Sequence, residues 1–479
     1  MKSIRIIFCL IALSLSVSAF SQDKLVREVL EKGKTDNRTM QHADYLSNRI
    51  GGRIIGSAAL EEAERWAADQ FRSWGLEVMV QEVGEINVGF ERGPWSGRML
   101  SEDGMILHFG TPSYTAGTKG PQKGHVVIAP KNKNEFDKVK GLLKGAWVLV
   151  DGVSEGWPID WREETDTLFF NEIAQAGALG FIQKANMPIT LLYDRKHCYD
   201  ITPDSLPTVC DIKLDPQQYD IIRQKVVDKK DFLLEFDIRN HFRVGPVKYH
   251  NIIGIIKGSK HPDEYVMLGA HLDSYDSATG AVDDGNGTSV VMEAARLLAS
   301  SGAHPDRSIM FCLWTGEEFG LLGSKYFVEN ETVPYDKISN YFNRDGGPTM
   351  ATSITVPPAM YDDFVKVCKP IEDYVEGVHF TVNKRQGEPG PRPEKASGSD
   401  HAYFTMNGIP GISFRESDPY GYNFDYREIW HTESDKYNKL IPEYMEPSSV
   451  ISAVVAYGLA NLNHLLSRDG LYKENDIEQ

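Results

Sequence analysis

A histidine and several aspartates are crowded into residues 269–288, GAHLDSYDSATGAVDDGNGT. His271 follows the apolar run EYVMLGA, and in extended backbone its side chain and that of Asp273 point the same way. Such a pair lets the histidine bind a metal ion while the carboxylate accepts its second ring N–H, although a solvated loop is the alternative. Asp283 and Asp284 precede the glycines that open a predicted helix. Acids cap helices, but adjacent carboxylates close to a further acid repel one another unless a cation lies between them.

Acidic residues also follow the next two apolar runs. SIMFCLW is followed by Glu317 and Glu318, and ISNYFN is followed by Asp345. Because neighbouring residues of an extended chain project to opposite sides, one glutamate can bind a metal while the other faces substrate and water. His431, within IWHTESDKYNKL, completes a set of two histidines, three ligand carboxylates and one further glutamate. This set suits two neighbouring zinc ions that share one carboxylate.

The elements that must position these residues follow from alternating patterns in the second half of the chain. Apolar strands at 264–270, 307–314 and 337–343 alternate with helical segments at 288–300 and 320–330. This order predicts an α/β fold with a mostly parallel central sheet and helices on both faces. In such sheets ligands bind at the carboxyl ends of the strands, where the candidate residues stand.

A different unit interrupts this pattern in the middle of the chain. The apolar strands GHVVIAP, GAWVLVDG and LGFIQKAN lie close together, and a new strand series begins at VKYHNIIGIIKG, residues 247–258. We therefore expect a small β-rich inserted domain over residues 101–245, with residues 22–100 and 246–479 forming the catalytic domain. One larger continuous sheet is the alternative.

The N-terminal segment predicts export. Residues 1–21 contain Lys2 and Arg5, then an apolar run, then Ala19 and Ser21, which is the pattern of a cleaved secretory signal. The apolar run is shorter than the roughly 20 residues that a membrane-spanning helix needs, so a membrane anchor is the weaker alternative. We expect the mature protein in the periplasm or outside the cell.

Composition limits the partners of the chain. It has 51 Lys and Arg residues against 68 Asp and Glu residues, a formal net charge of −17, so neither nucleic acid nor anionic lipid is an expected partner. Cys198 and Cys210 could form a disulfide in an oxidising compartment, whereas Cys312, inside an apolar run, is expected to be a buried thiol. These features leave the oligomeric state open.

Six segments together carry a family resemblance: GGRIIGSAALEEAERWAADQF, GAHLDSYDSATGAVDDGNGT, WTGEEFGLLGSKYF, NRDGG, GSDHAYF and WHTESDKYNKL. In them the chain resembles the co-catalytic di-zinc exopeptidases, the family of secreted zinc aminopeptidases and carboxypeptidase Q-like enzymes. The resemblance implies five zinc ligands: His271 with Asp345 on one ion, Glu318 with His431 on the other, and Asp283 bridging the two. KGAWVLVDG and AQAGALGFIQKAN resemble parts of a protease-associated domain.

Other residues take roles from the same resemblance. Glu317 matches the general base, and Asp273 matches the carboxylate behind the first histidine ligand. Asp284 follows the bridging ligand, where the family often has a strained peptide bond.

Asp400 and His401 match the family's SDH motif, close to the site but not among the ligands, with a helix cap and a solvated histidine as the alternative. Arg344 and Gly346 depart from the family, because many relatives have an apolar residue at one of these places. Candidates to shape a substrate pocket are Tyr422, Tyr426, Arg427 and Trp430.

The resemblance implies an exported, zinc-dependent hydrolase that cleaves the N-terminal bond of peptides or dipeptides. A transferrin-receptor-like binding ectodomain has the same fold without catalysis, and a glutaminyl-cyclase-like aminoacyltransferase uses a single zinc. The complete set of five ligands and a base disfavours both alternatives. Side-chain preference, the choice between aminopeptidase and dipeptidase, and the physiological metal stay open.

Overall fold

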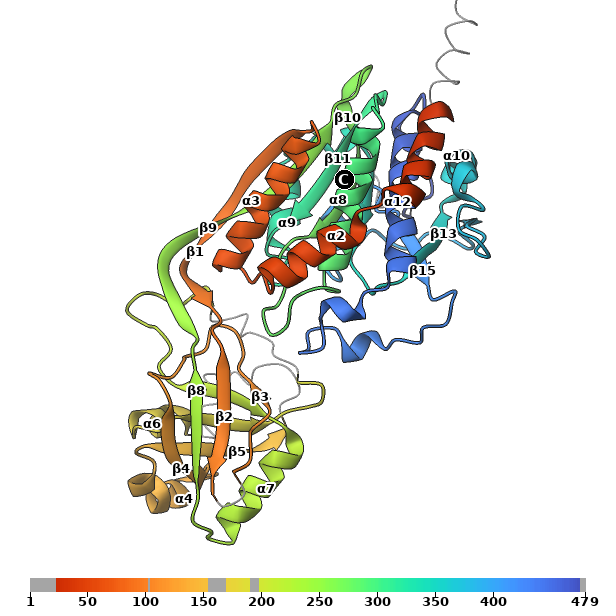
Figure 1. Cartoon of the computed structure of the whole chain (residues 1–479). Helices are drawn as coiled ribbons and strands as arrows, with labels where there is room; N and C mark the ends of the chain where they lie inside the picture. The colour runs from red at the N-terminus through yellow and green to blue at the C-terminus, as the bar shows by residue number, and fades with distance from the viewer. Residues whose placement is uncertain (1–22, 102–103, 154–168, 190–197, 474–479) are drawn as a thin grey trace, which may run out of the picture.

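The computed structural model describes residues 23–101, 104–153, 169–189 and 198–473, and it contains two units, each built around its own sheet (Figure 1). The predicted signal segment, residues 1–21, lies outside these residues. Within the described ranges, no helix is long and apolar enough to cross a membrane.

The sheet of the larger unit contains the strands that lead to the candidate residues. Its strand order is β1–β9–β11–β10–β12. The bounds are β1 Glu77–Glu91, β9 His241–Ile256, β10 His261–His271, β11 Arg307–Trp314 and β12 Ile338–Asn343. β10 is parallel to β11 and β12, whereas β9 is antiparallel to β1 and β11. The α/β fold with a mostly parallel central sheet is confirmed, because β1, β10, β11 and β12 run in one direction. Only β9 runs the opposite way, as the strand by which the chain re-enters the sheet.

Helices cover both faces of this sheet, as predicted. One helix spans residues 23–35, and the others are α2 Thr39–Asp44, α3 Ala58–Ser73, α8 Gly285–Ser300, α9 Leu322–Glu329, α10 Tyr361–Cys368, α11 His401–Met406 and α12 Pro442–Ala460. Phe311 of β11 packs in the core with α3, α8 and α12, while the next residue, Cys312, packs in the core with α9 and α11. Cys312 is a buried free thiol, as expected. Strands that are buried on both faces have nearly continuous apolar sequences, which explains the runs seen in β10 and β11.

A small sheet lies beside the first. Its order is β14–β13–β15, with bounds β13 Met350–Val356, β14 Thr381–Lys384 and β15 Phe414–Ser417. Phe414 of β15 stacks on Phe342 of β12 with ring centroids 5.2 Å apart. This contact joins the small sheet to the strand that leads to Asp345.

The smaller unit has a seven-stranded sheet of order β2–β8–β4–β5–β6–β7–β3. Its elements are β2 Trp95–Leu100, β3 Phe109–Gly110, β4 Gln122–Ile128, α4 Lys133–Val139, β5 Ala146–Val153, α6 Phe170–Gln175, β6 Gly180–Lys184, β7 Cys210–Leu214, α7 Pro216–Val227 and β8 Leu233–Ile238. Two apolar clusters of its own stabilise it, so one continuous sheet is ruled out. The sequence placed the boundaries at 100/101 and 245/246. Because β2 pairs with β8, residues 95–100 belong to this sheet, and residues 241–245 belong to β9.

The two cysteines of this region are separate buried thiols. Cys210 is not in a disulfide, so the bridge to Cys198 considered from the sequence is not formed. The identification of the unit as a protease-associated domain stays a prediction.

Three contacts fasten the smaller unit, and the crossing into it, to loops of the larger unit. They are Arg92 to Asp276 (2.8 Å), the Tyr199 hydroxyl to the carbonyl oxygen of Phe319 (2.9 Å), and His108 to Glu433 (2.8 Å). The Arg92 and Asp276 side chains are almost fully buried. These contacts reach three loops: the loop after β10, the loop after β11 and the loop before α12. The same loops carry most of the candidate site residues.

A buried ion-pair network anchors α8, which begins directly after the adjacent aspartates of the candidate site. Glu293 of α8 accepts hydrogen bonds from Arg296 Nε (2.8 Å) and the backbone N–H of Arg38 (2.9 Å), and it pairs with His42 Nε2 (3.1 Å). Burial raises the pKa of Glu293, but Arg296 and His42 outweigh burial and hold that pKa below its usual value. Such a carboxylate stabilises the fold above its unfolded-state pKa, and this contribution is lost as the pH falls through the lower folded-state pKa.

We predict that Glu293→Gln lowers the free energy of unfolding by about 3–5 kcal/mol at pH 7, because the buried charge of Arg296 loses its buried partner and keeps only the exposed Asp36. The difference should shrink as the pH falls through the lowered folded-state pKa of Glu293, where Glu293 itself becomes protonated. Urea unfolding followed by circular dichroism measures it. Glu82→Gln is the control, since Glu82 pairs with Lys248 at the surface and should hardly matter. Equal stability of the two variants would contradict the prediction.

Candidate metal centre

The carboxyl ends of β10, β11 and β12 meet at one edge of the first sheet. The parallel register sets the last residues of β10 and β11 side by side and places the last residue of β12 next to Gly269. His271, at the end of β10, therefore lies near Glu317 and Glu318 after β11 and near Asp345 after β12. This is the edge at which ligands bind in such sheets.

Five side chains form two groups that share one member. His271, Asp283 and Asp345 make the first group, and Asp283, Glu318 and His431 make the second; within each, one ligand atom per residue lies within 4.8 Å of the others. Asp283 faces both histidines, with Oδ1 3.2 Å from His271 Nε2 and Oδ2 3.2 Å from His431 Nε2. Glu318 Oε2 lies 3.0 Å from His431 Nε2. The structure thus brings together all five residues nominated from the sequence, in the division that the resemblance implied.

These groups concentrate carboxylates where water is excluded. Burial raises the pKa of Glu318 to about 6 and also raises the pKa of Asp345. Burial disfavours the charged imidazole of His431, but the carboxylates of Glu318 and Asp283 outweigh it and raise the pKa of His431 to about 10. Buried acids need positive charge beside them, and imidazole nitrogens with carboxylate oxygens are ligands of zinc. The donor set therefore fits a divalent metal such as zinc.

Asp273 holds the glutamate turn. Its Oδ1 accepts the backbone N–H of Glu317 over 3.0 Å, and its Oδ2 accepts that of Glu318 over 3.3 Å. The sequence predicted that this carboxylate would accept the ring N–H of His271. His271 Nδ1 instead lies 3.0 Å from the backbone carbonyl oxygen of Asp273 and 3.7 Å from its Oδ1, because the carboxylate is turned toward the two amides.

Asp284 also serves the backbone. It accepts the N–H of Gly287 over 2.9 Å, which caps α8, and the N–H of His271 over 3.1 Å. The peptide bond between Asp283 and Asp284 is cis, at the position that the resemblance singled out. Asp284 thus ties the start of α8 to the end of β10.

Asp400 and His401 lie beside the site without joining either ligand group. Asp400 precedes α11 but makes no side-chain cap; its carboxylate accepts a hydrogen bond from Ser324 instead. Burial raises the pKa of Asp400 to about 7 and lowers that of His401. The helix cap of the alternative is therefore absent, and the His401 side chain is partly exposed. Arg344, which departs from the apolar residue of relatives, is buried and ion-paired with Glu416.

Several contacts of the site were not predicted. Arg53 and Asp435 are buried charges that hydrogen-bond to the backbone after β10. Tyr275 packs against the His431 ring with centroids 4.5 Å apart. These residues lie in the segments that carry the family resemblance. Their spacing in the sequence does not indicate which backbone groups or rings they contact. Among the predicted pocket residues, Trp430 stacks on the His431 ring at 4.0 Å.

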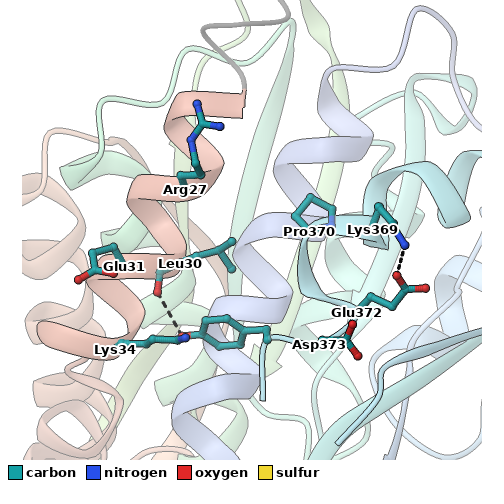
Figure 2. Close-up of a pocket in the computed structure, with 9 residues that line it drawn as sticks. Arg27, Leu30, Glu31, Lys34, Lys369, Pro370, Glu372 and Asp373 are labelled. Atoms are coloured by element: carbon teal, nitrogen blue, oxygen red, sulfur yellow. Dashed lines mark hydrogen bonds and ion pairs between the residues drawn. The ribbon is translucent and has the colours of Figure 1, made fainter. Parts of the chain in front are cut away.

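A surface cleft of about 530 Å³ lies elsewhere, between helix 23–35 and residues 369–374 (Figure 2). Figure 2 shows charges of both signs around it, with Lys369 directed toward Glu372. No member of either ligand group lines this cleft, so it is separate from the candidate centre.

We predict that zinc stabilises the chelator-treated protein by binding at this centre. A ligand present at about 100 times its Kd adds about 2.7 kcal/mol to the free energy of unfolding, so the melting temperature of the wild type should rise on zinc addition. Asp283→Asn should lose most of this rise, because Asp283 belongs to both groups. Asp363→Asn, which alters a surface pair with His464, should keep it. Differential scanning fluorimetry makes the comparison, and a wild type indifferent to zinc would contradict the prediction.

Several known proteins are similar to this chain in sequence or fold. Residues 251–455 match the family model for Peptidase family M28. Carboxypeptidase Q of Rattus norvegicus is 26% identical over 452 residues, covering 91% of this chain and 88% of its own. Among solved structures, a Peptidase M28 precursor from Shewanella amazonensis has a TM-score of 0.61 at 21% identity, covering 94% of this chain and 98% of its own. A zinc aminopeptidase from Bacillus subtilis has a TM-score of 0.55 at 21% identity, with 91% and 98% covered. Residues 251–455 therefore form a domain of the Peptidase family M28 type, and the chain is a metallopeptidase that is similar to co-catalytic zinc exopeptidases.

Proposed function

We propose that this chain is an exported exopeptidase that uses two zinc ions to hydrolyse the N-terminal bond of peptides or dipeptides. The observation that carries the proposal is the shared position of Asp283, whose two oxygens face one histidine each. A single metal ion would engage only one of the two ligand groups that share Asp283.

Five residues would hold the two ions. His271 and Asp345 are assigned to one ion and Glu318 and His431 to the other, with Asp283 shared between them. Zinc supplies Lewis-acid activation of water and of the scissile carbonyl group. The neighbouring Trp430 and Tyr275 rings restrict the His431 imidazole, which keeps its nitrogen aimed at the second ion.

Glu317 is the proposed general base. Burial raises its pKa well above the usual value; the imidazole of His271 opposes this, and the carboxylates of Glu318 and Asp345 reinforce it. A carboxyl group whose pKa is shifted toward neutrality can both accept and return a proton. We propose that Glu317 takes a proton from the attacking water and delivers it to the leaving amine, while Asp273 keeps its backbone in place.

The substrate assignment rests on metal ligation and on the relatives. The free α-amino group of a peptide, in its neutral form, could bind one of the two zinc ions as a nitrogen ligand, which would direct cleavage to the first peptide bond. Similarity to carboxypeptidase Q and to a zinc aminopeptidase supports a peptide as the substrate. A binding ectodomain without catalysis is not favoured, because all five ligand positions and Glu317 are present together.

We predict that the wild type cleaves aminoacyl-arylamides or unblocked dipeptides and fails on their N-acetylated counterparts. Glu317→Gln should lower kcat by about 10²–10⁴-fold, since general acid–base catalysis contributes that much, while the zinc content stays unchanged. Release of product and zinc per chain are measured on the same preparations.

Glu428→Gln is the control, because Glu428 is an exposed glutamate close to His431 in sequence. It should retain wild-type turnover. Absence of bound metal in the wild type, or full turnover by Glu317→Gln, would remove the basis of the proposal.

A further inference from the structure

Asp435 links the segment that carries the shared acid to the segment that carries the second histidine. It is buried and lies four residues after His431. Its Oδ1 accepts the backbone N–H of Val282 over 2.6 Å, and its Oδ2 accepts that of Asp283 over 3.2 Å. Its own carbonyl oxygen accepts the N–H of Thr279 over 3.0 Å. Asp435 alone thus accepts hydrogen bonds from three backbone N–H groups in the segment before α8.

Arg53 holds the same segment through carbonyl groups. Its side chain is fully buried. The acceptors of its guanidinium are the carbonyl oxygens of Gly51 (3.0 Å), Leu272 (2.7 Å), Thr279 (3.1 Å) and Gly280 (2.9 Å). Because the guanidinium presents its donors in a rigid plane, one side chain fixes several carbonyl groups at once. Residues 272–283 are therefore held by a buried guanidinium at their carbonyl oxygens and by a buried carboxyl group at their N–H groups.

We infer that Asp435 is a positioning residue for the metal centre, with Arg53 supporting the same loop. The inference rests on the proposed function, because the spacing of the two ligand groups matters only if both bind metal. The N–H that Asp435 holds belongs to Asp283, whose two carboxylate oxygens each lie 3.2 Å from a histidine Nε2. A shift of this backbone moves both oxygens together. Asp435 thereby fixes the position of the one residue that belongs to both ligand groups. A hydrogen bond to any other ligand would fix only one of the two groups.

Asp435→Asn tests this with minimal change of shape. An amide accepts at one oxygen only, and its NH₂ group faces a backbone N–H without a bond. The chain offers a matched control in Asp418, whose carboxylate also accepts two successive backbone N–H groups, those of Tyr422 (2.9 Å) and Asn423 (2.8 Å), away from both ligand groups. Asp418→Asn therefore imposes the same chemical change on a turn, residues 418–423, that contains no ligand.

The experiment measures zinc affinity by competition with a fluorescent chelator, together with kcat and KM on an arylamide that the wild type cleaves. Asp435→Asn should weaken zinc binding by about 10–100-fold, the usual effect of removing a residue that orients ligands. Its kcat should fall on subsaturating zinc and recover in excess zinc, with KM little changed. Asp418→Asn should match the wild type in zinc affinity. If Asp435→Asn does not fold, Arg53→Lys keeps the charge but loses the planar fork, and it should weaken zinc binding in the same direction.

Wild-type zinc affinity in Asp435→Asn, or in Arg53→Lys where that variant replaces it, would overturn the positioning role. Equal weakening in Asp418→Asn would overturn it too, because the effect would then be a general loss of stability. A wild type that binds no zinc overturns both this role and the proposed function. A zinc-loaded wild type that cleaves none of the substrates overturns the proposed function alone, since the affinity comparison still tests Asp435.

Discussion

The carboxylate of Asp283 lies between two histidines in a space that excludes water, and much of the fold serves to keep it there. Its two oxygens belong to different ligand groups, so its backbone has to be held from several directions. α8 starts directly after it, and the buried Glu293 network fixes that helix to the segment before α2. A buried acid facing two bases is costly unless every neighbouring polar group is also paired, which explains why the surrounding loops contain so many side-chain to backbone hydrogen bonds.

The acids crowded around the site therefore divide into two kinds. Some turn their oxygens toward the histidines and are candidates to bind metal. Others turn theirs toward backbone amides: Asp273 toward the glutamate turn, Asp284 toward α8 and the end of β10, and Asp435 toward Asp283. A carboxylate suits both tasks because it offers acceptors only, and a loop with exposed N–H groups needs acceptors as much as a cation does.

The smaller unit is connected to the candidate site by side-chain contacts as well as by the covalent chain. Its contacts reach the loop after β10, the loop after β11 and the loop that carries His431. The pair between Arg92 and Asp276 is buried, so breaking it would leave an uncompensated charge. These contacts tie the smaller unit to the loops of the candidate metal centre, and the antiparallel strands β1 and β9 form the covalent part of that connection.

The sequence by itself determined the α/β class, and it predicted an interruption by a second unit and the side chains of a candidate centre. Those predictions rested on local rules: apolar runs form buried strands, parallel strands end at a common edge, and acids or histidines placed just beyond them must meet. The tertiary structure decided the antiparallel pairing of β9, the extent of the second sheet, the orientation of the Asp273 carboxylate, and the roles of Arg53 and Asp435. These depend on hydrogen bonds between segments that lie far apart in the chain, such as Arg53 to Leu272 and Val282 to Asp435. The hydrophobic pattern of the sequence does not indicate such partners, because these donors and acceptors come within hydrogen-bonding distance only when the core has formed.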